Sequence, residues 1–217
     1  MRCLILVRHA QSIANRDGIG LGRADSPLTE FGLAQARATA ASLTGYSIGR
    51  IVASPLERAR LTAQAICDAQ NLNAKDELTV TIDERFTEMD VGELEGHTWK
   101  KVHNQYESFL SDWASDSIGR LAMPGGESLT DVLGRVLPAF ESLIELLTNP
   151  SQAESGDIVV VSHNFVLRVL ICNLLGLQLG NWRSFELGLA SKSTITCIRG
   201  QMVIVDLNNT AHLSAVI

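Results

Sequence analysis

Hydrophobic residues gather in four short runs along the chain, each bounded by polar, Gly or Pro positions. Apolar runs of this length, rich in Val and Ile, are typical of strands that are buried on both faces of a sheet. The pattern therefore predicts strands over residues 3–7, 50–54, 78–82 and 157–162.

Between these runs, apolar residues recur at steps of three and four, the period of a helix with one buried face. One helical pattern runs from Leu33 to Leu43. A second begins at SPLE (54–57), which has the form of a capping box with proline at the first helical position. A third is predicted from ESLTD (127–131) through Leu147. An apolar stripe marks a further helical stretch, and its members are Trp99, Val102, Tyr106, Phe109 and Trp113.

The last two apolar stretches, 194–199 and 202–207, predict a hairpin with Gly200 at the first central position of a tight turn. Strands that alternate with helices indicate a mainly parallel sheet with both faces covered. We therefore predict a single α/β domain over residues 1–217. It is a three-layer α/β/α sandwich whose mainly parallel sheet carries an antiparallel C-terminal edge hairpin. Residues 97–123 are expected to form a helical, lid-like insertion.

Composition narrows the possible partners. Of the 217 residues, 24 are acidic and 18 basic, so the net charge is −6 and binding to nucleic acid is not expected. The longest apolar run, FVLRVLICNLLGL (165–177), contains an arginine and is too short to span a membrane. Four scattered cysteines are expected to be free thiols. Together these features predict a cytoplasmic protein.

Nitrogen-rich side chains follow several predicted strands at the point where each strand ends. Arg8 and His9 follow the first strand, Arg58 comes soon after the second, and His163 and Asn164 follow the last. The carboxyl ends of parallel strands form the ligand crevice of such sheets. Two arginines and two histidines at one edge favour a compact anion, and phosphate fits best.

Arg58 lies in the first turn of the helix that the capping box is expected to open. A cation there opposes the helix dipole, while free backbone N–H groups and a guanidinium together favour a bound oxyanion. The alternative is an arginine on a solvated face, or one paired with Glu57 or Asp90.

Each histidine alone is more often structural than catalytic, and two at equivalent strand ends with two arginines reverse that balance. A zinc site is the other alternative for His9 and His163. No Cys, Asp or Glu accompanies either one at ligand spacing, and Arg8 would repel a dication. We therefore expect no metal and no cofactor.

Several motifs resemble the histidine phosphatase (phosphoglycerate mutase-like) superfamily. They extend from Arg8 to about Leu170 in the order seen in that family. The matching stretches are LVRHAQSIAN, DSPLTEFGLAQA, SPLERARLTA, EMDVGELEG, PGGES and VVVSHNFVLRVL.

The resemblance implies a role for each matching residue. His9 is the nucleophile, and it forms a phosphohistidine. Arg8, Arg58 and His163 surround the phosphoryl oxygens and stabilise the charge that develops on them. Glu88 protonates the leaving oxygen and then deprotonates the attacking water, and a phosphate dianion beside it should raise its pKa. Its alternative interpretation is a surface acid in an acidic loop.

The resemblance also implies four substrate-binding positions. Asn15 and the backbone N–H of Asn164 are further donors. Leu21 and Gly22 lie in the substrate loop, where members often have Gln before the glycine, so Leu21 removes a polar contact. Ala10 and Asn164 replace two common glycines, which affects the choice of substrate rather than the reaction.

The family includes hydrolases and cofactor-dependent mutases. The segment between Glu88 and PGGES is short, and EMDVGELEG resembles the phosphatase branch, so we predict hydrolysis of a small phosphorylated metabolite without a metal. A phosphoglycerate mutase-type phosphotransferase is the alternative, and a non-catalytic phosphate-binding module ranks below both. The edge hairpin leaves a homodimer open.

Overall fold

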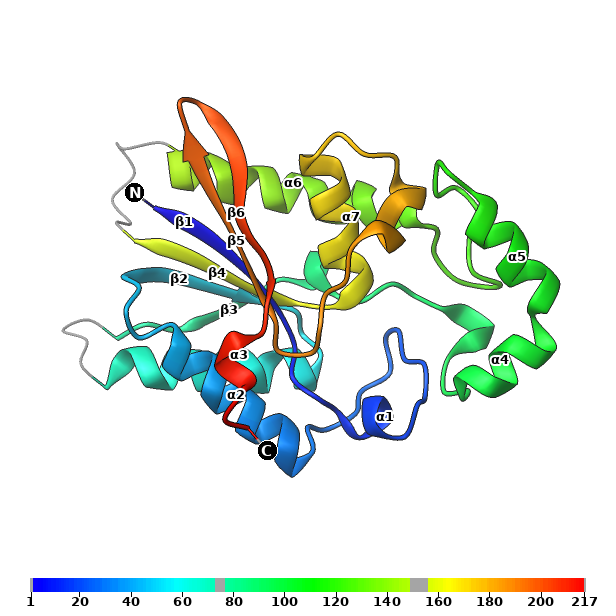
Figure 1. Ribbon diagram of the computed structural model, residues 1–217, viewed down its shortest axis with the longest axis horizontal. Helices are drawn as coiled ribbons and strands as arrows, with labels where there is room; N and C mark the ends of the chain where they lie inside the picture. The colour runs from blue at the N-terminus through cyan, green and yellow to red at the C-terminus, as the bar shows by residue number, and fades with distance from the viewer. Residues whose placement is uncertain (1, 73–76, 149–155, 217) are drawn as a thin grey trace.

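The computed structural model describes residues 2–72, 77–148 and 156–216, and a six-stranded sheet forms its centre (Figure 1). The order of the strands across the sheet is β3-β2-β4-β1-β5-β6. The four predicted strands exist, with small shifts at their ends. In chain order the strands are β1 (Cys3–Arg8), β2 (Ile48–Ala53), β3 (Val80–Ile82), β4 (Asp157–Ser162), β5 (Lys192–Ile198) and β6 (Gln201–Asn209).

Strands β1 to β4 run parallel to one another, whereas β5 lies antiparallel beside β1 and β6 antiparallel beside β5. The predicted mainly parallel sheet with an antiparallel C-terminal edge is thus confirmed. β6 is the outermost strand on its side of the sheet, so its free edge could pair with a second copy of the chain. Such a homodimer stays a prediction.

The hairpin turn differs from the prediction in one detail. Ile198 pairs with Gln201, so Arg199 and Gly200 are the two central residues, with φ of 52° and 82°. Positive φ at both positions gives a type I′ turn, whose twist matches that of the flanking strands. Gly200 is therefore at the second central position, and the predicted first position was wrong.

Helices cover both faces of the sheet, as Figure 1 shows. Helices α2 (Glu30–Ser42) and α3 (Glu57–Asn71) pack against one face, and α6 (Leu129–Thr148) and α7 (Asn164–Leu174) against the other. Side chains alternate accordingly: Leu4 and Leu6 belong to the core on the α6 and α7 side, whereas Ile5 and Val7 belong to the opposite core. This arrangement confirms the three-layer α/β/α sandwich.

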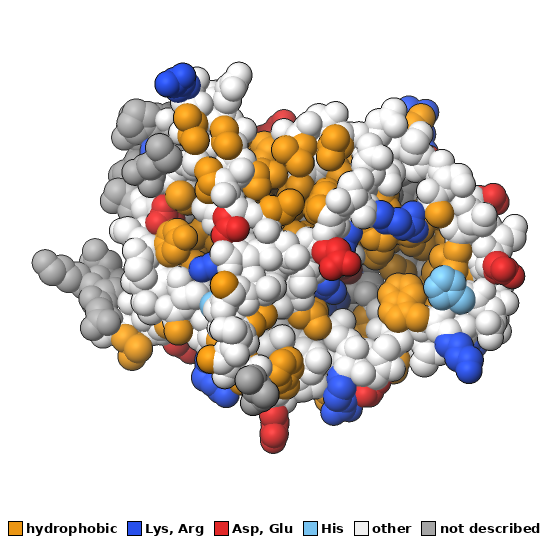
Figure 2. All heavy atoms as spheres, viewed as in Figure 1, with side chains coloured by type: hydrophobic (Ala, Val, Ile, Leu, Met, Phe, Trp, Pro, Cys, Tyr) orange, Lys and Arg blue, Asp and Glu red, His pale blue; other side chains and the backbone are white. Residues whose placement is uncertain are grey.

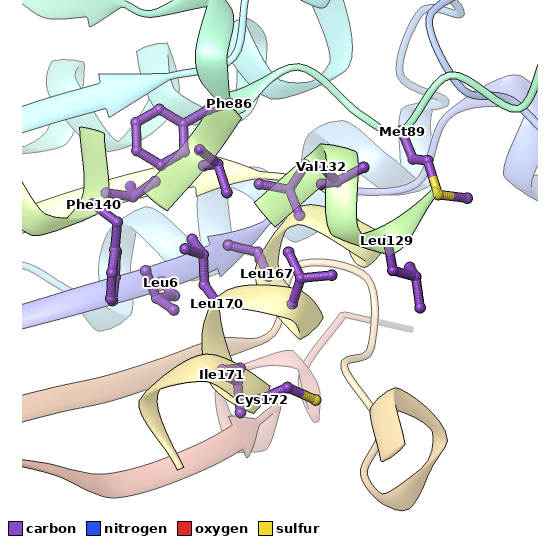
Figure 3. Close-up of a cluster of buried hydrophobic side chains, with 14 of the residues drawn as sticks. Leu6, Phe86, Met89, Leu129, Val132, Phe140, Leu167, Leu170, Ile171 and Cys172 are labelled. Atoms are coloured by element: carbon purple, nitrogen blue, oxygen red, sulfur yellow. The ribbon is translucent and has the colours of Figure 1, made fainter. Parts of the chain in front are cut away.

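The core on the α6 and α7 side also holds the segment that follows β3 (Figure 3). Phe86 and Met89 from this segment are fully buried with Leu6, Phe140 and Leu170. Burial of each large apolar side chain contributes about 1.5–3 kcal/mol to the free energy of folding. The segment between Phe86 and Met89 is thereby fixed at both ends.

The predicted capping box at the start of α3 was wrong. Helix α3 begins at Glu57, its N-cap is Leu56, and no side chain of that stretch caps it. Instead, the carboxylate of Asp25 accepts a hydrogen bond from the Glu57 N–H at 2.7 Å. Ser54 lies before the helix and accepts only from the Leu56 N–H, at 3.3 Å. A carboxylate from a distant segment has taken the place of the local cap, and it suits the positive end of the helix.

Helices α4 (Trp99–Gln105) and α5 (Glu107–Ser115) occupy the predicted 97–123 insertion and lie beyond the carboxyl ends of the strands (Figure 1). The apolar stripe is thus divided between two helices that meet at Tyr106. A lid-like movement and the single-domain organisation stay predictions. The described residues include no helix that is both long enough and apolar enough to cross a membrane. The shorter elements are α1 (Ile13–Arg16), η1 (Glu84–Phe86), η2 (Gly92–Leu94), η3 (Leu179–Ser184) and η4 (Ala211–Leu213).

Candidate active site

One cavity lies at the carboxyl ends of the parallel strands. Arg8, His9, Arg58 and Glu88 all line it. His163 does not, but it lies directly behind, with its ring centroid 5.1 Å from that of His9. On the face shown in Figure 2 the molecule is hollowed in its right half, where hydrophobic side chains and Lys or Arg side chains meet. The structure therefore brings together the five residues predicted to be catalytic.

His9 is held in one tautomer by its surroundings. Its backbone N–H donates to the Ser162 carbonyl at 3.0 Å, which ties it to the end of β4. Its Nδ1 lies 2.8 Å from the Ala10 carbonyl, and since a carbonyl only accepts, Nδ1 carries the proton. Burial, and then Arg58 and Arg8, lower the pKa of His9 well below its ordinary value. The ring is therefore neutral, with a lone pair on Nε2.

His163 is fully buried and forms the N-cap of α7. Its Nε2 lies 2.7 Å from the Ser54 hydroxyl, while its Nδ1 is buried without a hydrogen-bond partner among the described residues. Burial, followed by the nearby His9 and the arginines, lowers its pKa well below the ordinary value. When Ser54 donates to Nε2, Nδ1 carries the proton and needs an acceptor, which a phosphoryl oxygen would supply.

Arg58 has an exposed fraction of only 2%. Its two terminal nitrogens donate to the carbonyl groups of Ala24 and Gly22, each at 2.8 Å. Its nearest carboxylate is that of Asp25 at 4.0 Å, so neither acid offered as a partner by the sequence neutralises it. Two carbonyls thus fix the direction of the guanidinium while leaving most of its charge available to a ligand.

Arg8 is the second buried guanidinium of the cavity. Its Nη1 donates to the Leu187 carbonyl, and its Nε is buried without a partner among the described residues. Burial lowers the pKa of Arg8 to about 10, and the carboxylate of Glu88 acts in the opposite direction. A buried guanidinium N–H without a partner, in a cavity that holds a second guanidinium, is typical of a site that receives an anion.

Glu88 projects from the fixed segment between Phe86 and Met89 and is almost completely buried. Its carboxylate accepts from the Met89 N–H at 2.9 Å and from the Phe165 N–H at 3.3 Å. Burial raises the pKa of Glu88, although these hydrogen bonds and the two arginines partly offset the effect. The acid therefore keeps its proton to a higher pH than an exposed glutamate does.

Of the four predicted substrate-binding residues, Asn15, Leu21 and Asn164 line the cavity. Gly22 does not. Its carbonyl supports Arg58, and a Cβ at this position would collide with the carbonyl of Met89. Gly22 therefore allows a close approach between two loops. It supports Arg58 and does not itself line the cavity.

Asn15 and Asn164 are each oriented by a neighbour. The side-chain oxygen of Asn15 accepts from the N–H and hydroxyl of Ser12, at 3.1 and 2.9 Å, so its amide N–H groups are left for a ligand. The side-chain oxygen of Asn164 accepts from Nε of Arg168 at 3.0 Å. Asn164 is the first residue of α7.

A family model described as the histidine phosphatase superfamily (branch 1) matches residues 4–210. The chain belongs to this superfamily. The resemblance found in the sequence is thus confirmed, and the protein is a phosphatase of the histidine phosphatase type.

The relatives include phosphatases and a probable mutase. The chain is 35% identical to phosphoserine phosphatase 1 of Hydrogenobacter thermophilus over 97% of this chain and 93% of the relative. It is 31% identical to a probable phosphoglycerate mutase of Yersinia pestis over 96% and 93%. A solved mycobacterial glucosyl-3-phosphoglycerate phosphatase in complex with VO3 superposes with a TM-score of 0.83, at 27% identity over 97% of this chain and all of that one.

In this histidine phosphatase the cavity continues past the predicted catalytic residues to a second, apolar wall. We call it the outer wall, and it is formed by Leu21, Leu94, Trp99, Trp113, Phe165 and Trp182. The tryptophans at positions 99 and 113 belong to the apolar stripe found in the sequence, so that stripe serves the cavity as well as the core.

No role was predicted for η3, which contributes Trp182 to the outer wall and places Arg183 beside it. Arg168 of α7 donates to the carbonyl groups of Trp182 and Phe185, both at 2.6 Å, and lies over the Trp182 ring. A signal was present: Arg168 interrupts the apolar run of α7, and a buried arginine requires specific partners. The identity of those partners was not readable from spacing.

Proposed function

We propose that this histidine phosphatase hydrolyses phosphomonoesters through a phosphohistidine on His9, without a metal ion. Nε2 of His9 attacks phosphorus, so that an N–P bond forms while the bond from phosphorus to the alcohol oxygen breaks. Glu88 gives its proton to that oxygen, and the alcohol leaves. Water then attacks phosphorus, Glu88 takes a proton from it, and the N–P bond breaks to release inorganic phosphate and free His9.

Charge stabilisation in both steps is assigned to Arg8, Arg58 and His163, with Asn15 and Asn164 as further donors to the phosphoryl oxygens. Fixed donors cost no reorganisation when negative charge develops, which makes them effective in a water-poor cavity. Two guanidinium groups supply the positive field that a metal ion provides in other phosphatases.

One observation carries the proposal: a neutral His9 whose Nε2 holds a lone pair shares a cavity with a buried Glu88 of raised pKa. A module that only bound phosphate would need the arginines but no proton donor. The retention of a buried acid beside the nucleophile supports turnover over simple binding.

The test is to trap the intermediate. With an excess of chelator, wild-type protein mixed with a ³²P-labelled phosphomonoester and quenched in base should carry acid-labile label. His9→Ala should carry none and should lose at least about 1000-fold in kcat/KM. His97→Ala is the matched control, because this histidine does not line the cavity, and it should be labelled like wild type. Label on His9→Ala, or loss of activity with chelator alone, would refute the proposal.

Phosphoryl transfer to a second acceptor is the alternative, and the relative named a probable phosphoglycerate mutase favours it. A mutase requires a bisphosphorylated primer, whereas a hydrolase does not. If the primer raised isomerisation of a phosphoglycerate far above release of inorganic phosphate, the mutase assignment would replace ours.

We further propose that the enzyme acts in the cytoplasm on a small phosphorylated metabolite and binds neither nucleic acid nor membranes. The four cysteines are free, which supports a reducing compartment. The acidic net charge of −6 supports the absence of a polyphosphate partner.

A further inference from the structure

The cavity is larger than a phosphoryl group requires. Its volume is about 670 Å³. A phosphoryl group takes the space of a few water molecules, on the order of 100 Å³. Most of the cavity must therefore accommodate the alcohol half of the ester, and this part of the cavity is bordered by the outer wall.

The outer wall is aromatic and preorganised. The rings of Trp113, Phe165 and Trp182 contact one another in tilted and edge arrangements, with centroids 5.2 to 5.9 Å apart. The guanidinium of Arg183, which also lines the cavity, packs on Trp182 and Trp113 at 4.4 and 4.9 Å from their centroids. Mutual packing of this kind fixes the wall before a ligand arrives.

Trp99 is the part of the outer wall that is open to a ligand. It has an exposed fraction of 51% although it lines the cavity. Its position is fixed by the segment that contains Gly18 and Gly20, since the Trp99 backbone N–H donates to the Gly18 carbonyl and its ring lies against Gly20. An exposed indole at the mouth of a cavity offers a flat face for stacking.

The charges that line the cavity disfavour a cationic alcohol half. Among the described residues that line the cavity, Glu88 is the only acid, and it lies beside the phosphoryl site. The ionisable groups of the outer part are His103 and Arg183, so an ammonium group on the alcohol half would find no carboxylate there. A small polar alcohol would leave the apolar wall in contact with water.

We propose that the preferred substrate is a phosphomonoester whose alcohol half carries a bulky aromatic group and no ammonium group, and that Trp99 stacks on the aromatic group. This inference rests on the proposed phosphatase activity and names the substrate class of the same site. It separates this chain from a phosphoserine phosphatase, although a relative 35% identical to it bears that name.

The test compares esters that share a primary C–O–P linkage, so that leaving-group chemistry is nearly constant. They are 2-naphthylmethyl phosphate, octyl phosphate, ethyl phosphate, phosphoserine and 3-phosphoglycerate. We expect kcat/KM for the naphthylmethyl ester to exceed that for the ethyl ester by at least about 100-fold, because even one methylene in an apolar pocket is worth about 10-fold or more.

Each outcome decides something. Phosphoserine or 3-phosphoglycerate turned over as well as the naphthylmethyl ester would overturn the inference but leave the phosphatase activity standing. Octyl phosphate equal to the naphthylmethyl ester would overturn the aromatic preference. If none of the five esters, nor 4-nitrophenyl phosphate, released phosphate, the proposed function itself would fail.

A pair of variants tests Trp99. Trp99→Ala should raise KM for the naphthylmethyl ester by about 10-fold and leave ethyl phosphate within about twofold, and Trp99→Phe should restore most of the loss. Phe31→Ala is the matched control, because this aromatic also lies exposed in the first turn of a helix but does not line the cavity. An equal loss for both esters, in a variant that melts like wild type, would overturn the stacking role.

Discussion

The two ends of the cavity are built on opposite principles. The inner end is polar and hidden: His9, Arg58 and Glu88 are each at least 95% buried. The outer end is apolar and partly open, with Trp99 half exposed and Arg183 at the surface. The inner end is suited to one chemical group, the phosphoryl group, whereas the outer end is suited to a range of bulky apolar groups on the alcohol half of the ester.

This difference shows how one cavity divides its work. At the inner end, low exposure lowers the pKa of His9 and His163 and raises the pKa of Glu88, because burial disfavours every charged form that a neighbour does not support. Changes at the inner end should therefore affect all substrates alike, and changes at the outer end should alter only the ratio between substrates.

The largest effect is expected from Arg58→Ala. This variant removes a buried guanidinium from the phosphoryl site, and kcat/KM should fall about 1000-fold or more for the naphthylmethyl and ethyl esters alike. The ratio between the two esters should stay within about twofold. Steady-state kinetics with both esters measure the loss and the ratio together.

Two controls make the result readable. Arg60→Ala removes an exposed arginine from the same helix and should leave both esters unchanged. Arg58→Ala also leaves the carbonyls of Gly22 and Ala24 without a donor, so thermal unfolding must show that the variant is folded at the assay temperature. A folded variant that lost only the naphthylmethyl ester would break the division between the two ends.

Glu88→Gln should have the next largest effect. Glutamine keeps the shape of the side chain but cannot donate a proton to the leaving oxygen, so kcat/KM for the alkyl esters should fall by about 100-fold to 10,000-fold. With 4-nitrophenyl phosphate the loss should be much smaller, because its leaving group needs little protonation. Comparison of the two substrate types in one variant isolates the proton from general damage.

Glu84→Gln, which removes an exposed carboxylate from η1, is the matched control and should leave every substrate unchanged. An equal loss for alkyl and nitrophenyl esters in Glu88→Gln would mean that Glu88 positions the substrate and does not move a proton.

The inner end was predictable from the sequence because its residues follow strands, and strands leave a strong local pattern. Once 3–7, 50–54 and 157–162 are assigned to parallel strands, Arg8, Arg58 and His163 are expected at one edge of the sheet. In the structure Arg8 and Arg58 line one cavity with His9, and His163 lies against His9. The burial of Glu88 and its hydrogen bonds to two backbone N–H groups were harder to predict, since the same loop contains other acidic residues that the local sequence does not distinguish from it.

The outer end was not predictable to the same degree. Arg168, Trp182 and Arg183 meet through contacts between segments distant in sequence, and no spacing encodes such contacts. The start of α3 failed for the same reason: SPLE satisfies the local rule, but Asp25, 32 residues earlier, supplies the bond that the cap would have made. Local patterns predict elements, while long-range contacts decide what fills their ends.

The smallest effect, and the most direct test of burial at the inner end, is expected in the pH profile of kcat/KM. Because the pKa of Glu88 is raised, the protonated acid should persist above the ordinary range, and activity with alkyl esters should fall about tenfold per pH unit only beyond that raised pKa. Because the pKa of His9 is lowered, no loss from a histidine should occur near pH 6.5. As the pH is lowered, the first loss of activity should come from protonation of the phosphate ester at about pH 6 and not from His9. Glu88→Gln should lack the fall in activity at alkaline pH, which would assign that fall to the proton of Glu88.

Trp99→Ala should keep the acid and alkaline limbs of the pH profile where wild type has them, since an open indole at the mouth of the cavity affects KM and not the protonation of the inner end. A shifted alkaline limb in Trp99→Ala would show instead that the outer wall controls the proton chemistry, and the two ends would then have to be treated as one coupled site.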